Sequence, residues 1–124
     1  MSTEKRGRGP NAHNKNKAEI GKKVAFPLVL EVFEYWKFTM GKKRAQLDIK
    51  RERDLRWAIA VYSVEGCKEA IAGCALSDFH MGKNKQKTVY NDISVIFRDA
   101  EHVEKFQELY DAGNTSAKSN WASE

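Results

Sequence analysis

The sequence is short of the residues that mark several classes of protein. It has two cysteines in 124 residues, and the spacing of Cys67 and Cys74 fits no common zinc pattern. On a helix the two would lie about 10 Å apart along the axis, too far for a disulfide, so both are expected to be buried free thiols. No apolar run approaches the roughly 20 residues of a membrane-spanning helix. The polar, basic segment 1–17 lacks the apolar stretch of a secretory signal, which predicts a cytoplasmic protein with no membrane partner.

The sequence also lacks the residue combinations that enzymes need. Its three histidines have no metal-ligand partner at helical spacing. Ser77, Asp78 and His80 are too close in sequence for a catalytic triad, because triads are assembled from distant segments. The stretch Gly7-Arg8-Gly9 lacks the strand and helix that flank a phosphate-binding loop. We therefore predict no enzyme activity, no catalytic residues, no metal ligands and no cofactor.

What the sequence does have is positive charge arranged in blocks. The 22 lysines and arginines exceed the 17 acids, for a formal net charge of +5. Residues 1–26 carry seven bases and two acids, residues 37–57 eight and three, and residues 83–87 three lysines, whereas residues 91–124 carry three bases and seven acids. Blocks of one sign indicate faces with different tasks. A basic face suits a polyanion such as DNA, and a solubilising surface is the alternative.

Hydrophobic spacing predicts an all-α fold that begins with a helix after Phe26-Pro27. Apolar residues recur every three or four positions over residues 28–40, Pro27 suits a first helical turn, and Gly41 suits the cap. With Leu30 and Phe38 included, the apolar stripe is wide. A homodimer formed through this face is therefore one alternative for the function.

Two further helices are expected to follow in close succession. Asp48 can cap a helix over residues 49–62, which has an apolar face and a basic outer side. Ser63 can cap a third helix, whose glycines, Gly66 and Gly73, suggest close packing against a neighbour. The tight junction at Tyr62-Ser63 resembles that of an αα-hairpin or helix-turn-helix unit.

Residues 77–91 are expected to form a polar loop, and Tyr90, Ile93, Ile96 and Phe97 a short apolar helical turn, although Val95-Ile96-Phe97 could instead be a strand. A last helix follows, capped by Asp99 and closed by Gly113. The whole is a compact bundle of four to five helices. We expect residues 1–25 to form a disordered basic arm, residues 26–112 the helical domain and residues 113–124 a flexible, frayed tail.

The residues expected to bind nucleic acid are bases that fall outside the apolar stripes. They are Arg6, Arg8, Lys42, Lys43, Arg44, Lys50, Arg53, Lys83, Lys85 and Lys87. In the loop, Phe79 and Met81 are expected to tuck onto the core, His80 to bond a backbone carbonyl, and Gly82 to take a positive φ. The alternative is a hinge that presents the three lysines to phosphate.

Aromatic residues are interleaved with these bases, so stacking on unpaired bases is an option. They are Tyr35, Trp36, Phe38, Trp57 and Tyr62. Helical spacing favours a core position for Trp36 and Tyr62. Trp57, beside Arg53 and Arg56, is either a binding aromatic or a packing residue.

The run from Val32 to Phe106, about three fifths of the chain, carries an ordered pattern of short segments. These are Trp36, Met40-Gly41, Arg44-Ala45-Gln46-Leu47-Asp48, Tyr62-Ser63-Val64-Glu65-Gly66-Cys67-Lys68, Ala70-Ile71-Ala72-Gly73-Cys74, His80-Met81-Gly82-Lys83-Asn84, Tyr90-Asn91-Asp92-Ile93 and Arg98-Asp99-Ala100-Glu101-His102-Val103-Glu104-Lys105-Phe106. The pattern resembles a small helical domain found at the C-terminal end of phage replication proteins. That domain is broadly similar to the DNA-binding domains of DnaD-type helicase loaders.

The resemblance implies a phage-encoded, DNA-binding accessory protein of replication, acting in the host cytoplasm. In larger members of the family a winged-helix or other domain precedes this one, whereas here a basic segment precedes it. A copy of this kind could bind DNA, or it could be an adaptor or inhibitor that binds a host or phage replication, transcription or defence protein. The resemblance assigns no role to any individual residue.

Overall fold

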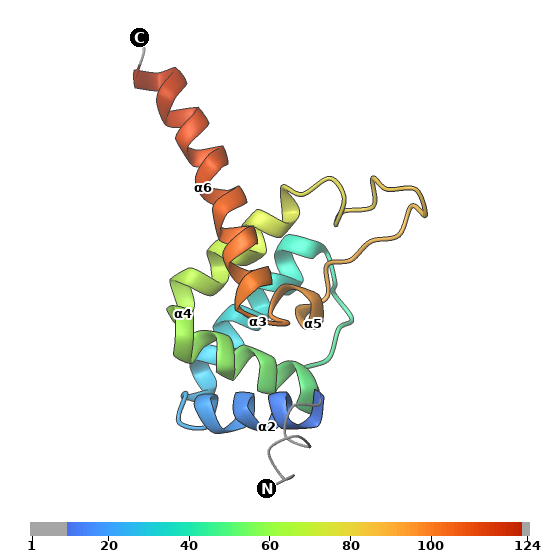
Figure 1. Cartoon of the computed structure of the whole chain (residues 1–124), viewed down its shortest axis with the longest axis vertical. Coiled ribbons are helices and arrows are strands. Elements are labelled where there is room, and N and C mark those ends of the chain that lie inside the picture. The colour runs from blue at the N-terminus through green and yellow to red at the C-terminus, as the bar shows by residue number, and fades with distance from the viewer. Residues whose placement is uncertain (1–9, 123–124) are drawn as a thin grey trace, which may run out of the picture.

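The computed structural model describes residues 10–122, and the side chains of residues 16–113. The described chain is all α-helical and forms a compact bundle, as the hydrophobic spacing predicts (Figure 1). Its elements are α2 (Pro10–Gly21), α3 (Phe26–Met40), α4 (Ile49–Ala75), α5 (Ile93–Ile96) and α6 (Ala100–Ala122).

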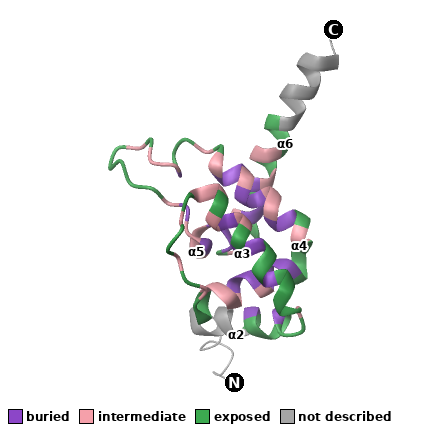
Figure 2. Cartoon of the chain, turned by 180° about the vertical axis from the view of Figure 1, so that it is seen from behind, coloured by how far each residue is buried: buried purple, intermediate pink, exposed green. Residues whose placement is uncertain are grey.

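Helix α4 is the central element of the bundle, because α2, α3, α5 and α6 all pack against it. The buried residues of these helices gather along it, as Figure 2 shows. Trp36, Phe97 and Phe106 are the largest fully buried side chains, and they come from α3, the segment after α5, and α6. Burial of this apolar surface is the main force that holds the bundle together.

Helix α4 bends at Ser63, where the sequence predicts a junction between two helices. The backbone of Ser63 has φ 72° and ψ 169°, a region that residues other than glycine rarely enter. Its hydroxyl accepts a hydrogen bond from the backbone N–H of Gly66 at 3.2 Å, which is the N-cap geometry expected of it. The bend turns the second half of α4 toward α6.

Three of the predicted helix caps, Asp48, Asp99 and Gly41, are confirmed. Asp48 accepts a hydrogen bond from the backbone N–H of Arg51 at 2.8 Å, and Asp99 from that of His102 at 2.9 Å. Gly41 ends α3 in the left-handed conformation with φ 66°. These caps satisfy backbone groups that a helix terminus would otherwise leave unpaired.

Gly73 allows α6 to cross α4 closely, as its place in the sequence suggests. A Cβ at this position would collide with the backbone of Phe106. Cys67 and Cys74, on the same half of α4, are buried free thiols as expected, and burial raises the pKa of each to about 12. This half of α4 is therefore tightly packed scaffold.

Two boundaries differ from the expectation. Residues 10–21, placed by composition in a disordered arm, form helix α2, which packs on α4 through the buried side chain of Lys17. Composition misses this because the helix is attached by the polar contacts of Lys17 and by the close approach of Gly21 to the backbone of Arg56 and Trp57, and not by an apolar stripe. At the other end α6 runs through Gly113 to Ala122. Gly113 faces Leu76, so its small size serves packing and does not end the helix. Residues 1–9, with Arg6 and Arg8, lie outside the described residues.

Candidate nucleic-acid interface

Three segments along one side of the protein carry most of the described basic residues that form no ion pair. In Figure 1 the yellow-to-orange loop between α4 and α5, the linker between α3 and α4, and the start of α4 follow one another down the right-hand edge. Within the described chain, the three bases of the linker and Lys50 at the start of α4 form no ion pair, and all but Lys42, which is partly buried, are exposed. They are Lys42, Lys43, Arg44 and Lys50.

The loop over residues 77–92 is held by its own hydrogen bonds. The Asn84 amide donates to the carbonyls of Phe79 and Thr88 at 2.8 and 2.7 Å, and its oxygen accepts from the Thr88 N–H at 3.1 Å. An antiparallel bridge joins Met81 to Val89. The three exposed lysines of residues 83–87 are therefore carried at the tip of an organised loop. Of these lysines only Lys83 is paired in the described residues, with Asp78 at 3.7 Å.

The base of this loop is built differently from the sequence expectation. His80 is buried, but its Nδ1 lies 2.7 Å from the Ser77 hydroxyl and not against a backbone carbonyl. Phe79 stays half-exposed and stacks on Tyr90 at 5.7 Å, so it does not tuck onto the core. Gly82 has the positive φ predicted for it, 104°. Burial, and then the charge of Lys105, lower the pKa of His80, which favours its neutral form.

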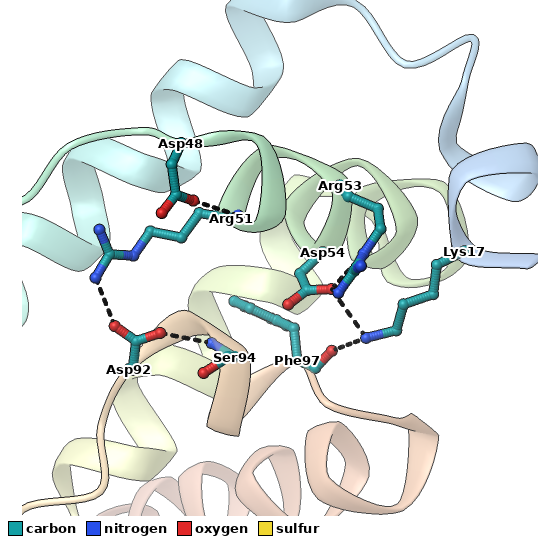
Figure 3. Close-up of polar contacts among 8 residues, drawn as sticks. All are labelled: Lys17, Asp48, Arg51, Arg53, Asp54, Asp92, Ser94 and Phe97. Carbon is teal, nitrogen blue, oxygen red and sulfur yellow. Dashed lines mark hydrogen bonds and ion pairs between the residues drawn. The ribbon is translucent and has the colours of Figure 1, made fainter. Parts of the chain in front are cut away.

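The arginines on the first half of α4 point into the molecule, as Figure 3 shows for Arg51 and Arg53. Arg51 donates to the Gln46 carbonyl and to the Asp92 carboxylate, both at 2.7 Å. Arg53 donates twice to one oxygen of Asp54, at 3.2 and 2.9 Å. Arg56 is paired in the same way, with Glu52 and the Val24 carbonyl. The predicted phosphate contact Arg53 is therefore engaged in internal bonds.

A buried ion pair beneath these arginines was not predicted. Lys17 and Asp54 are 3% and 1% exposed, and the Lys17 ammonium lies 3.1 Å from Asp54 Oδ1 and donates to the Phe97 carbonyl at 2.6 Å (Figure 3). Desolvation lowers the pKa of Lys17, while the attraction of Asp54 opposes that effect. The available signal was the position of Asp54, one turn before the core residue Ala58 on the inward face of its helix.

The aromatic residues divide sharply by exposure. Trp36 is buried and its indole donates to the Asn91 carbonyl at 2.9 Å, and Trp57 is buried with the Lys17 ammonium 4.7 Å from its ring. Tyr62, partly buried, bonds Glu104 at 3.1 Å. Phe38 is 87% exposed, so it does not widen the buried stripe of α3 as the spacing suggests.

No known protein family, curated protein or solved structure matches the chain. Among the side chains that the structure describes, no group of three or more histidine, cysteine or acidic residues is placed to hold a metal ion. No helix within the described range is long and apolar enough to cross a membrane. The bases on the loop, the linker and the start of α4 present ammonium and guanidinium groups that can bind phosphate.

Proposed function

We propose that this protein is a non-catalytic DNA-binding accessory protein that contacts the phosphate backbone through the basic side. The basic side comprises the partner-free bases and the loop lysines: Lys42, Lys43, Arg44, Lys50, Lys83, Lys85 and Lys87. The resemblance of the sequence pattern to phage replication domains favours replication as the setting and the host cytoplasm as the location. Arg53 is not included, because its guanidinium is engaged by Asp54.

The observation that carries the proposal is the separation of paired from unpaired bases. The arginines of α4 satisfy carboxylates and carbonyls inside the fold, whereas the linker bases have no acidic partner in the described chain. Helix α6 instead exposes acidic residues, namely Glu101, Glu108 and Asp111. Charges of one sign gathered on one side raise the local potential for a polyanion.

The test is binding of a labelled DNA by fluorescence anisotropy across a salt series. We expect affinity to fall steeply with salt. The variant Lys42→Ala, Lys43→Ala, Arg44→Ala should reduce the slope of log affinity against log salt by about 0.9 for each duplex phosphate released. The matched control, Lys22→Ala, Lys23→Ala, Lys105→Ala, removes the same charge elsewhere and should change the slope much less. Equal effects of the two variants would show that net charge alone drives binding.

A protein partner is the second candidate function. Two large apolar side chains one helical turn apart at the start of α3, Phe26 and Leu30, are 45% and 38% exposed, and such a pair on one face suits an adaptor or inhibitor of a replication, transcription or defence protein. Capture of a host or phage protein that survives nuclease treatment and is absent with Phe26→Ser, Leu30→Ser would support this candidate. Loss of every captured protein on nuclease treatment would oppose it.

A further inference from the structure

Phe38 is an aromatic residue that the fold leaves almost entirely in solvent. It lies in the last turn of α3, away from the buried residues Val32 and Trp36 of the same helix. Its ring lines a surface hollow together with Glu34, Lys37 and Lys43. The ring is thus part of the same surface as the linker bases.

We propose that Phe38 is a base-stacking residue, which receives an unpaired base of a single-stranded nucleic acid while Lys43 and its neighbours on the linker bind the flanking phosphates. This inference rests on the proposed function and deepens it, because it names the form of nucleic acid. A phenyl ring gives a flat π face on which any base can stack. In a duplex the bases are already stacked on each other, so the ring has no equivalent partner there.

The surroundings of Phe38 favour a nucleic acid over a protein. Apart from the ring, every residue lining the hollow is charged: Glu34, Lys37 and Lys43. The centre of a protein–protein interface is normally depleted of lysine and glutamate, whereas an aromatic ring flanked by lysines is the usual composition of a single-strand site. The Glu34 carboxylate repels phosphate but can accept hydrogen bonds from the amino groups of bases. The strand backbone should therefore pass on the Lys43 side of the ring.

The distinguishing experiment uses probes of equal charge with and without bases. Labelled oligothymidylate, an abasic strand of the same length, and a duplex are titrated by anisotropy with wild-type protein and with Phe38→Ala. Stacking of one base predicts that Phe38→Ala weakens the affinity for oligothymidylate about tenfold. Affinity for the abasic strand and the duplex should change less than about twofold, because phosphate contacts remain. An oligouridylate arm reports whether the same ring also accepts RNA.

Two variants control this result. Phe38→Trp keeps a ring and should retain the affinity, and oligothymidylate, but not the abasic strand, should quench the added tryptophan fluorescence. Ile49, also 87% exposed and near Lys50, has no π face, so Ile49→Ala should leave all affinities unchanged. If wild type binds oligothymidylate and Phe38→Ala binds it equally well, or loses affinity equally for the abasic strand, the stacking role is wrong. Failure of wild type to bind any probe would instead overturn the proposed function.

Discussion

The first half of α4 and the linker before it are equally basic in sequence and opposite in structure. The arginines of α4 are each partly buried and bonded to a carboxylate or a carbonyl of the same molecule. The bases of the linker, Lys42, Lys43 and Arg44, have no such partners among the described residues. One region uses its positive charge to hold helices together, and the other keeps it available.

Residue type accounts for part of this division. Arginine presents several donors in a planar fork and suits internal bonds to carboxylates and carbonyls, while lysine is a strongly hydrated point charge that is usually left at the surface. Lys17 is the exception. It is held inside by Asp54, by the Phe97 carbonyl and by the ring of Trp57. A block of basic residues in the sequence therefore shows only where positive charge is concentrated. Which of these charges can bind a ligand depends on whether the folded protein supplies each base with an internal carboxylate or carbonyl partner.

The largest effect is expected from breaking the buried pair. Asp54→Asn leaves the Lys17 ammonium buried without a countercharge and removes the negative charge from the group that accepts from Arg53, so we expect a loss of about 3–5 kcal/mol in the free energy of unfolding. Urea denaturation followed by circular dichroism measures it. The double variant Lys17→Met, Asp54→Leu should recover much of the loss, because it buries no unpaired charge. A loss for Asp54→Asn below about 1 kcal/mol would contradict the buried pair.

The same lysine makes the stability of the fold depend on pH. The pKa of Lys17 is lowered below 10.5 in the folded protein, chiefly by desolvation. Between the lowered value and 10.5 the unfolded chain binds a proton that the folded chain has released, so the stability of wild type relative to Lys17→Met should rise with pH in that window. The slope is at most about 1.4 kcal/mol per pH unit. The free energy of unfolding is measured for both proteins over a pH series. The difference between the two removes the contribution of the thiols, because these titrate in both proteins. A difference in the free energy of unfolding that stays constant or falls with pH would contradict a lowered pKa for Lys17.

Adjacent residues offer a smaller but direct comparison. Arg51 donates hydrogen bonds to both the Gln46 carbonyl and the Asp92 carboxylate. Burial alone would raise the pKa of Asp92, but hydrogen bonds from Arg51 and Ser94 hold this pKa below its ordinary value. Arg51→Ala should therefore cost about 1.5–3 kcal/mol of stability, the usual value for hydrogen bonds to charged groups. Lys50→Ala, one residue earlier and exposed, should change stability by less than about 0.5 kcal/mol. Equal losses in urea would show that the two residues do not differ in role.

The parts of the fold that follow from local chemistry were predictable. Apolar spacing over 28–40 and the caps Asp48, Ser63 and Asp99 depend on residues within a few positions of each other, and the structure has each of them. The sequence also shows where positive charge is concentrated, because counting it needs no partner.

What could not be predicted depends on contacts between distant segments. The helix at residues 10–21 is mostly polar, and its attachment involves contacts with distant residues, among them Lys17 with Asp54, 37 positions away, and Gly21 with the backbone of Arg56. The exposure of Phe38 is a similar case, because its spacing also fits a wide apolar stripe and only the packing of α3 on α4 shows which face is covered. Periodicity gives a helix its faces but does not choose the neighbour of each face.

The loop should show the smallest effect on stability and a clear effect on binding. Lys85→Ala, Lys87→Ala changes two exposed side chains that have no ion pair within the described chain, so the free energy of unfolding should shift by less than about 0.5 kcal/mol. The slope of log DNA affinity against log salt should fall by about 0.9 for each duplex phosphate that these lysines no longer neutralise.

Asn84→Ala is the matched control, because it removes the hydrogen bonds that organise the loop and leaves every lysine in place. We expect Asn84→Ala to lower the affinity for DNA without changing the salt slope, and the lysine variant to lower the slope. This pair of results would show that the hydrogen bonds of the loop hold its lysines in position for binding. If neither variant affects binding, the basic side ends at the linker.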